Sequence, residues 1–483
     1  MKVTILIVCL LAFLYTFSTQ TFAADFTVNL TTDEFDASTA DTLCDTDLAA
    51  VGLQCTLRAA VQQANALSSN DRTLFSLPAN SIITLTIANG GEIPIEDNGT
   101  LEIVGTGANN LTINGGEGPN RIFRTNFATV TISGVTLTGG NATSAGLSGL
   151  GGAIFAGGGS LMLDSVHITG NSASNAGGGV YFIGSGTPTI INSTFSANTA
   201  FNCGGFVNEA GFLIVVNSTI SGNRADNVGG GFCNQSDATL RNATVTDNSA
   251  TNGGGIYQGN GTLHFGNTIV AGNFVQATGF APEIQFAGGT ITSSGGNLVS
   301  NNSGVEAAFP AGNPNANNDK VGTFDSVINP LLAALLNNGG PTPTHALLVG
   351  SPAIDAGLSA NVSLTTDQRA TGFSRIVDGD GDGSAIVDIG AFERQLVATA
   401  ATVSVSGRVL SSRGRGVSNA VVYLTNQRGE IQTARTNRSG YYTFQEITAG
   451  ESYIFNVYAK RYQFNAQVIT LTEDLAELNF TAQ

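Results

Sequence analysis

The 483-residue chain has no tryptophan, two methionines, three histidines and three lysines, and only 11% of its residues are charged. It carries 62 glycines instead. This composition is far from that of helical proteins, so long helices are not expected. The 19 Lys and Arg face 35 Asp and Glu, which gives a net charge of −16. Nucleic acid and anionic lipid are therefore not expected as partners of the surface as a whole.

The three histidines, His167, His264 and His345, leave little to hold a catalytic zinc ion. None of them has a second His or a Glu at helical spacing, as the motifs of zinc peptidases require. Zinc carboxypeptidase activity is therefore not expected.

Residues 1–23 are expected to be a secretory signal. Lys2 supplies a positive start, residues 3–17 form an apolar run, and Thr21 and Ala23 place small residues at a cleavage site. No later segment reaches the roughly 18 apolar residues of a membrane span. We expect an exported protein, secreted or at the cell surface, with no transmembrane segment after cleavage.

Four cysteines remain after this signal, an even number, as is usual in an exported chain. Cys44 and Cys55 are the expected disulfide, which would close a short loop. Cys203 and Cys233 lie at different offsets in their repeats. We therefore expect two buried thiols at these positions.

Asparagines recur through the middle of the chain at a nearly constant spacing, in register with apolar columns. The first column is Asn171, Asn198, Asn223, Asn248 and Asn273; a second column precedes it at a fixed offset and contains Ser165, Asn192, Asn217, Asn242 and Asn267. Third strands are expected to begin at Val180, Phe206, Phe232 and Ile256. Short strands that repeat in this way, without helical pattern, predict a parallel β-helix.

Both asparagine columns are interpreted as structural ladders. Asn tolerates the left-handed backbone of a sharp turn, and stacked amides can bond from rung to rung. The alternative is glycosylation, since Asn192, Asn217 and Asn242 begin acceptor patterns. The ladder is favoured because a glycosylation signal has no reason to keep register with the apolar columns.

The ends of the coil have their own patterns. An alternating strand (26–36) and an amphipathic helix (55–66) predict an N-terminal cap within residues 24–74, and the coil is expected over 75–395. A small-residue linker (396–402) follows. Seven predicted strands then indicate a β-sandwich over 403–483; they are 403–409, 420–425, 431–436, 441–447, 453–458, 466–471 and 475–481. The predicted fold class is all-β.

Several motifs carry family resemblances. "CTLRAA" (55–60) resembles the Cys-Ser-Leu-Arg-Glu-Ala motif of an N-terminal module in secreted bacterial β-helix proteins, with Ala59 in place of Glu. "NNGGPTPTHALLVGSPAIDAG" (337–357), "TTDQR" (365–369) and "DIGAFE" (388–393) resemble the choice-of-anchor Q domain, here 290–395. The rungs are similar to repeats of chlamydial polymorphic outer-membrane proteins. These resemblances imply a right-handed β-helix exported to the cell surface or medium, and they imply no particular activity.

The C-terminal part of the chain (403–483) resembles the carboxypeptidase regulatory-like, transthyretin-type domain, notably in "VSGRVLSSRGRGVSNAVVYL". This resemblance implies an accessory, stabilising or adhesive module without catalysis.

Two constellations are candidates for chemistry. Arg224, Asp226 and Asp247 lie on adjacent rungs and are the nearest approach to a catalytic cluster, with solvated turn charges as the favoured alternative. "DGDGDGSAIVDIG" (378–390) opens like an acidic calcium loop but has Ile389 at its twelfth position. Its candidate ligands are Asp378, Asp380, Asp382, Ser384 and Asp388, and the alternative is a charged glycine turn.

These patterns together predict a non-catalytic β-helix scaffold, adhesive or carbohydrate-contacting, whose partner is an extracellular polysaccharide or a cell-surface ligand. The alternative is a polysaccharide lyase or glycoside hydrolase with its site on one face of the coil. Calcium is the one cofactor for which the sequence offers a candidate site.

Overall fold

The computed structural model describes residues 22–67, 69–96, 99–143, 148–275, 282–395, 402–426, 430–449, 452–471 and 474–483. It divides into two compact units, 1–395 and 396–483. Most of the expected signal (1–21) and linker (396–401) lie outside the described residues. Among the residues described, no helix is both long and apolar enough to cross a bilayer.

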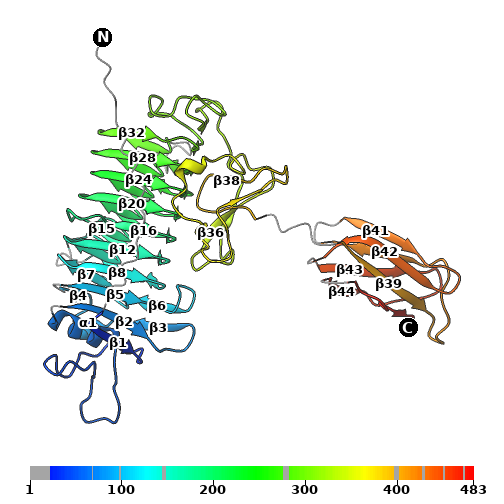
Figure 1. Cartoon of the computed structure of the whole chain (residues 1–483), viewed down its shortest axis with the longest axis horizontal. Helices are drawn as coiled ribbons and strands as arrows, with labels where there is room; N and C mark the ends of the chain where they lie inside the picture. The colour runs from blue at the N-terminus through cyan, green and yellow to red at the C-terminus, as the bar shows by residue number, and fades with distance from the viewer. Residues whose placement is uncertain are drawn as a thin grey trace. The chain divides into compact units, whose positions relative to one another are not determined.

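The first unit is a solenoid of parallel strands stacked in four sheets, which we label A to D (Figure 1). One rung runs through all four, for example from β16 (Thr189–Ile191) to β17 (Thr194–Ser196), β18 (Thr199–Asn202) and β19 (Phe206–Asn208). Each strand pairs in parallel with its counterpart one rung on, as Phe195 does with Ile220. The predicted all-β parallel solenoid is confirmed.

Sheets A and B have ten strands each. Sheet A contains β1 (Ala24–Val28), β2 (Asn70–Phe75), β5 (Thr100–Val104), β8 (Thr129–Ser133), β12 (Ser160–Asp164), β16, β20 (Phe212–Val216), β24 (Asp237–Arg241), β28 (Thr262–Gly266) and β32 (Thr290–Ser293). Sheet B contains β3 (Ser81–Thr84), β6 (Leu111–Asn114), β9 (Thr136–Thr138), β13 (His167–Thr169), β17, β21 (Thr219–Ser221), β25 (Thr244–Thr246), β29 (Ile269–Ala271), β33 (Leu298–Val299) and β34 (Lys320–Val321).

Sheet C has eight strands and sheet D has six. Sheet C contains β4 (Ile93–Ile95), β7 (Phe123–Asn126), β11 (Ile154–Gly157), β15 (Val180–Phe182), β19, β23 (Phe232–Asn234), β27 (Ile256–Gln258) and β31 (Ile284–Phe286). Sheet D contains β10 (Asn141–Ala142), β14 (Ser172–Ala176), β18, β22 (Arg224–Ala225), β26 (Ser249–Ala250) and β30 (Phe274–Val275). The sheet C strands β15, β19, β23 and β27 begin at the residues expected for the third strands.

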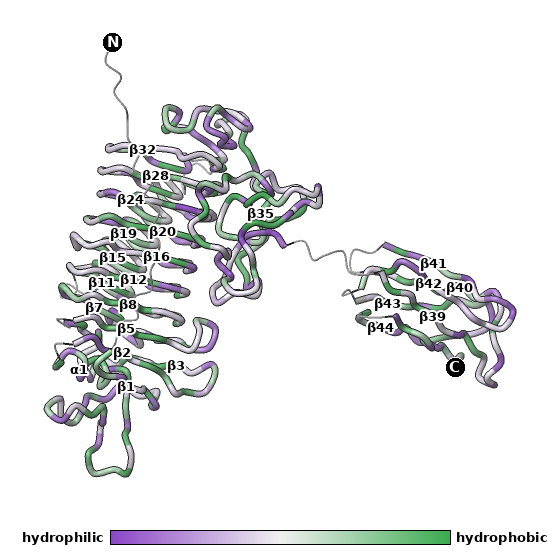
Figure 2. Tube along the Cα trace, viewed as in Figure 1, coloured by the Kyte–Doolittle hydropathy of each residue, from purple (hydrophilic) through white to green (hydrophobic). Residues whose placement is uncertain are grey.

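The core of the solenoid is built from columns of apolar side chains that stack from rung to rung. Along each rung, hydrophobic strand positions are separated by turns that are mostly hydrophilic or neutral (Figure 2). Phe206 and Phe232 lie one above the other with ring centroids 4.7 Å apart. Leu163, Ile190, Val215, Leu240 and Phe265 form another column, each at most 1% exposed. Each rung therefore buries its inner face only against its neighbours, as solenoids do.

The helix α1 (Leu57–Ala66) closes the first rungs. Thr56 caps it, because its hydroxyl oxygen accepts from the backbone N–H of Ala59 at 3.1 Å. Strand β1 pairs in parallel with β2 and so already belongs to sheet A. The coil therefore begins earlier than residue 75, where it was expected, because the N-terminal strand continues the sheet.

Residues 330–395, which we call the covering segment, leave the coil instead of continuing it. Their short strands pair only with each other: β35 (Leu332–Leu336) with β36 (Thr344–Leu347), and β37 (Ile376–Val377) with β38 (Ile386–Val387). The segment packs on the outer face of sheet B, where the Thr194 hydroxyl donates to the carbonyl of Pro343. The expectation that the coil extends to residue 395 is therefore wrong.

The second unit is a β-rich region with seven strands in two sheets. One sheet has the order β42-β39-β45 and the other β41-β40-β43-β44. The strands are β39 (Thr402–Leu410), β40 (Val421–Thr425), β41 (Ile431–Arg435), β42 (Tyr441–Thr448), β43 (Ser452–Tyr458), β44 (Gln467–Thr470) and β45 (Phe480–Thr481). They enclose a core of their own that includes Val405, Val422 and Phe455.

Candidate functional site

The first asparagine column forms an unbroken ladder inside the turn between sheets B and D. Each side-chain Nδ2 donates to the Oδ1 of the next Asn at 2.9 to 3.0 Å, and each backbone N–H donates to the same oxygen at 3.0 to 3.1 Å. Nδ2 also donates to a backbone carbonyl one rung back, as Asn223 does to Phe195 at 2.9 Å. The members are Asn171, Asn198, Asn223, Asn248 and Asn273, all at most 5% exposed. The hydrogen-bonding groups of these amides therefore link one rung to the next.

The ladder ends on a buried carboxylate. Glu283 accepts from Nδ2 and the backbone N–H of Asn273 at 2.7 and 3.1 Å, and from the N–H of Gly272 at 3.0 Å. Ser300 donates to it as well. Burial raises the pKa of Glu283, while these hydrogen bonds lower it. A cavity of about 310 Å³ adjoins it, but its carboxylate is fully engaged and is not placed as a free general acid.

The second asparagine column does not form a ladder. Asn192, Asn217, Asn242 and Asn267 all adopt the left-handed backbone, with φ between 47° and 51°. Three of the four amides have separate partners: Asn192 donates to Asp164, Asn217 donates to the carbonyl of Thr366, and Asn267 bonds to the backbone of Leu358. The interpretation of this column as a ladder is wrong because its amides do not bond to one another, and those of Asn217 and Asn267 bond to the covering segment instead.

A ladder that the sequence analysis missed lies inside sheet C. Asn208 Nδ2 donates to Asn234 Oδ1 at 2.7 Å, and Asn234 Nδ2 donates to Gln258 Oε1 at 2.9 Å. All three side chains are buried. Each follows a ladder asparagine at a nearly constant offset along the chain, so the register was visible in the sequence.

The covering segment meets sheet B through hydroxyl groups that point out from the coil. Gln368 accepts from the Thr219 hydroxyl at 2.6 Å and donates to that of Thr194 at 2.7 Å. His345 lies between the carbonyl of Ala333, 2.7 Å from Nδ1, and the hydroxyl of Ser221, 2.8 Å from Nε2. Burial lowers the pKa of His345.

The Ser221–His345 pair resembles the hydroxyl–imidazole pairs of nucleophilic catalysis. Ser221, however, is only 2% exposed and lies beneath the covering segment. Substrate has no access to its oxygen. The pair serves to attach the segment to the coil.

A buried ionic cluster holds the covering segment together. Arg369 binds Asp367 at 2.7 Å and lies between the rings of Phe373 and Phe392, each with its centroid 3.8 Å away. Arg375 donates to Asn217 and to the carbonyl of Gly390.

Two carboxyl groups complete this cluster. Glu393 lies 3.6 Å from Arg375 Nη1 and accepts from the N–H of Asp388 at 2.9 Å. Burial raises the pKa of Glu393 and of Asp388, and it lowers the pKa of Arg375. The motifs "TTDQR" and "DIGAFE" thus supply a structural cluster.

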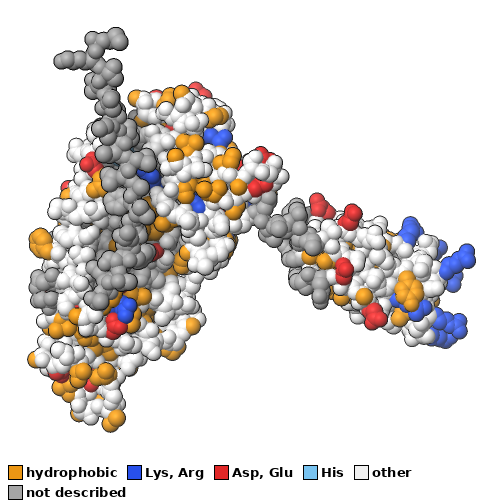
Figure 3. Space-filling view, viewed as in Figure 1, with side chains coloured by type: hydrophobic (Ala, Val, Ile, Leu, Met, Phe, Trp, Pro, Cys, Tyr) orange, Lys and Arg blue, Asp and Glu red, His pale blue; other side chains and the backbone are white. Residues whose placement is uncertain are grey.

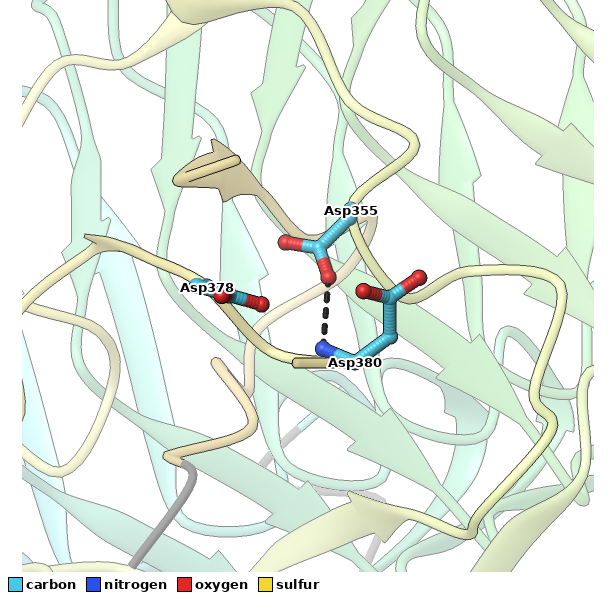
Figure 4. Close-up of side chains that lie close together, drawn as sticks. All are labelled: Asp355, Asp378 and Asp380. Carbon is cyan, nitrogen blue, oxygen red and sulfur yellow. Dashed lines mark hydrogen bonds between the residues drawn. The ribbon is translucent and has the colours of Figure 1, made fainter. Parts of the chain in front are cut away.

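The acidic loop gathers three carboxylates, those of Asp355, Asp378 and Asp380 (Figure 4). Ligand atoms from all three lie within 4.8 Å of one another. Asp355 comes from outside the predicted loop; its Oδ2 accepts from the N–H of Asp380 at 2.8 Å. Burial raises the pKa of Asp355.

Three of the predicted ligands lie outside this group. Asp382 accepts from the N–H of Ser384 in a local turn, 2.8 Å away. Asp388 is 0% exposed and accepts from the N–H groups of Asp355 and Arg394 at 2.7 and 2.5 Å. The predicted ligand set is therefore wrong at Asp388, which belongs to the buried ionic cluster.

The candidate catalytic residues Arg224, Asp226 and Asp247 do not form one cluster in the structure. Arg224 and Asp226 form an exposed ion pair at 2.7 Å, with side chains 57% and 56% exposed. Asp247 is a turn residue with φ 57°, and its Oδ2 lies 4.0 Å from Nε2 of His345. These contacts are typical of charged residues in solvent-exposed turns, the alternative that the sequence favoured.

Both pairs of cysteines are disulfides. Cys44 is bonded to Cys55, and Cys203 is bonded to Cys233. The expectation of two thiols at Cys203 and Cys233 is wrong. Cys203 lies in a turn with a left-handed backbone, and Gly229 occupies the corresponding turn of the next rung. The Sγ atom of Cys233 lies close to this second turn: it would be 2.7 Å from a Cβ built on Gly229.

Two parts of the chain are similar to known families. Residues 120–303 match the family model described as a right-handed beta helix region. Residues 404–483 match the model of the carboxypeptidase regulatory-like domain. No curated protein matches the chain.

Proposed function

We propose that the chain is an exported, non-catalytic scaffold that binds an extracellular polysaccharide or a cell-surface ligand along the outer face of sheet A. Export is supported by the signal-like pattern of residues 1–23 and by two disulfides, which persist in oxidising compartments. The motif residues 55–60 and the covering segment resemble modules of exported β-helix proteins, and that finer assignment is part of this proposal.

The observation that carries the proposal is the regular outer face of sheet A. Two rows of outward side chains follow its strands in register, and most are partly or fully exposed. One row contains Thr100, Thr129, Ser160, Phe212, Asp237, Thr262 and Thr290, and the other Glu102, Thr131, Met162, Thr189, Ile214, Thr239, His264 and Thr292.

The chemistry of these rows suits a repeating polyol. Hydroxyl groups both donate and accept hydrogen bonds, as sugar hydroxyls do. They recur at the spacing of parallel strands, about 4.8 Å, so a polymer can repeat its contacts along the face. Phe212, 40% exposed, offers an apolar ring beside them. Sheet B offers no such face where the covering segment lies on it.

Binding and turnover by the chain without residues 1–23 test this proposal. Binding to a panel of neutral and acidic polysaccharides is measured together with the release of reducing or unsaturated ends. A Thr131→Val, Thr239→Val variant, which removes two hydroxyl groups from the row and keeps the shape of the side chains, is expected to weaken binding. Thr112→Val removes a hydroxyl group from sheet B and is the control.

Unchanged binding by the sheet A variant would contradict the proposed face. Sugar ends released by the unmodified chain would favour the alternative, a polysaccharide lyase or glycoside hydrolase. A second variant, Asp226→Ala with Asp247→Ala, would then show whether the exposed turn charges take part.

We further propose that Asp355, Asp378 and Asp380 bind calcium. Carboxylate oxygens are the ligands Ca²⁺ prefers, and three of them converge here from two segments. Thermal melting with and without calcium is the test. Calcium should raise the melting temperature of the unmodified chain and of Asp382→Asn, but not of Asp378→Asn or Asp355→Asn. Equal shifts in all four proteins would exclude this site.

A further inference from the structure

One end of the β-sandwich carries an exposed group of basic side chains, which we call the basic tip. It is made by three loops, 411–420, 436–440 and 459–466, and by the strand end that precedes the second of them. Its members are Arg413, Arg415, Arg435, Arg438, Lys460 and Arg461, all exposed. The three loops contain no acidic residue.

Strand pairing brings these loops to one end. In one sheet Val421, where β40 begins, pairs with Arg435 at the end of β41 and with Tyr458 at the end of β43. In the other sheet Arg408, near the end of β39, pairs with Tyr441 at the start of β42. Each of the three loops therefore leaves the sandwich on the same side.

Hydrogen bonds join two of these loops. Arg435 Nη1 donates to Asn419 Oδ1 at 3.0 Å, and Arg408 Nε donates to the carbonyl of Ser439 at 2.8 Å. A Cβ on Gly416 would clash with that same carbonyl oxygen, so the two loops are in close contact there. Loops 411–420 and 436–440 are thus packed against each other.

The positive charge of the tip is not neutralised within the sandwich. No ion pair to an acidic residue is formed by any of the six cations among the described residues of this unit. The acids Glu430 and Asp474 lie on loops of the other end. Figure 3 shows Lys and Arg gathered at one end of the sandwich and Asp and Glu away from it.

This separation of charge is hidden in the composition of the whole chain. Residues 402–483 carry eight basic and six acidic residues, a net charge of +2. Residues 24–395 carry ten basic and 29 acidic residues, a net charge of −19. The chain is therefore acidic overall, while the surface of the tip is locally positive.

Three exposed tyrosines accompany the cations. Tyr441, Tyr458 and Tyr462 are 53%, 63% and 41% exposed, and they lie in or beside the same loops and strand ends. The guanidinium of Arg408 lies 4.9 Å from the ring centroid of Tyr441. Flat rings next to guanidinium groups can stack on a ligand while its anionic groups are bound bidentately.

We propose that the basic tip binds an acidic polysaccharide, through carboxylate or sulfate groups held by the arginines and sugar faces stacked on the tyrosines. A lipid headgroup surface offers no flat ring for the tyrosines. Nucleic acid carries one charge per roughly 1.7 Å of duplex, so the net charge of −16 on the whole chain disfavours it more than a polymer with sparser charge. The site is distinct from the face of sheet A and does not depend on it.

Binding of the full chain without residues 1–23 to immobilised polygalacturonate, neutral dextran, phosphatidylserine vesicles and single-stranded DNA tests the proposal. The unmodified chain should bind polygalacturonate more tightly than dextran, and less tightly as salt is added. Arg413→Ser with Arg438→Ser should weaken this binding about tenfold or more. Arg224→Ser with Lys320→Ser removes the same charge from the solenoid and should leave it unchanged.

Equal losses in the two double variants would overturn the tip as the site, because net charge alone would then explain binding. Tighter binding to vesicles or DNA than to polygalacturonate would overturn the ligand class. Tyr462→Ala keeps the charge and should weaken polygalacturonate binding while leaving its salt dependence in place. Because Thr131 and Thr239 lie in the other unit, failure of the sheet A variants has no bearing on this result.

Discussion

The side-chain amide of Asn273 donates to a carboxylate oxygen of Glu283 at 2.7 Å, and this bond ends the asparagine ladder. Every amide in the ladder donates in the same direction, so the last one needs an acceptor that belongs to no further rung. A carboxylate is suited to this place because it accepts on both oxygens and donates on neither. The backbone N–H groups of Gly272 and Asn273 also need an acceptor here, and both donate to the same carboxylate.

Replacement of Glu283 by Gln is therefore expected to destabilise the solenoid although the shape is kept. The glutamine NH₂ group replaces an oxygen that accepts hydrogen bonds, so two donors then face each other. A buried donor left without an acceptor destabilises the fold by about 2 kcal/mol. Chemical denaturation measures the loss. Glu306→Gln is the matched control, because this residue is exposed and accepts hydrogen bonds from nearby backbone N–H groups, such as that of Gly304. A similar effect in both variants would show that Glu283 is not a ladder cap.

The two asparagine columns are expected to respond in opposite ways to substitution. Asn223→Leu removes a ladder member together with the bonds that its amide accepts from the backbone N–H and Nδ2 of Asn198 and donates to the carbonyl of Phe195, and should cost about 3 to 5 kcal/mol. Asn242 is buried with φ 50°, and among the described residues neither the oxygen nor the nitrogen of its amide has a hydrogen-bond partner. Asn242→Gly keeps the turn and should change the unfolding free energy by less than about 1 kcal/mol.

Hydrogen exchange distinguishes local from global effects of these changes. Loss of protection should centre on the rungs next to Asn223 in the first variant. If Asn242→Gly were as damaging as Asn223→Leu, the division of the columns into ladder and anchors would be wrong.

The periodicity of the sequence was enough to predict the solenoid, since apolar and asparagine columns in register describe a stacked rung. It did not reveal sheet D, whose strands are as short as two residues. Their inward column, Ala173, Ala200, Ala225 and Ala250, keeps the period, but alanine in a glycine-rich stretch is a weak apolar signal. The covering segment lacks the period of the rungs, and the motifs found in it did not indicate that it leaves the coil.

The site residues show a similar limit. Spacing along the chain suggested Asp388 as a calcium ligand, whereas Asp355, which precedes the acidic loop in the chain, is the carboxylate that joins Asp378 and Asp380. The net charge of the whole chain likewise gave no sign of the basic tip, because the positive charge of the second unit is outweighed by the negative charge of the first. Both the acidic group and the basic tip are formed by residues that are distant in the sequence. A local sequence pattern does not show which distant segments lie together.

The Cys203–Cys233 disulfide should stabilise the solenoid by closing a long loop. The two residues are 30 apart, so in the chain-entropy model the bond contributes about 3 to 4 kcal/mol. Cys203→Gly with Cys233→Ala is the suitable variant, because Cys203 has φ 56° and glycine holds the corresponding turn of the next rung. Thermal melting should show a clear loss, and peptide mapping without reductant should recover the two residues linked in the unmodified chain. Recovery of both as free thiols would refute the pairing.

Glu393 and Asp388 make the stability of the solenoid depend on pH in a defined direction. Burial raises the pKa of both carboxyls, so the folded chain holds protons that the unfolded chain releases above about pH 4. Their contribution is fully present below that pH and is lost as pH rises through the folded values, by at most about 1.4 kcal/mol per pH unit for one group. The acidic charge of the chain acts in the same direction, so a comparison of slopes is needed. Glu393→Gln should flatten the fall of unfolding free energy with pH, whereas Glu34→Gln, which removes an exposed charge outside the cluster, should keep the slope. Identical slopes in the two variants would show that the buried cluster binds no additional proton.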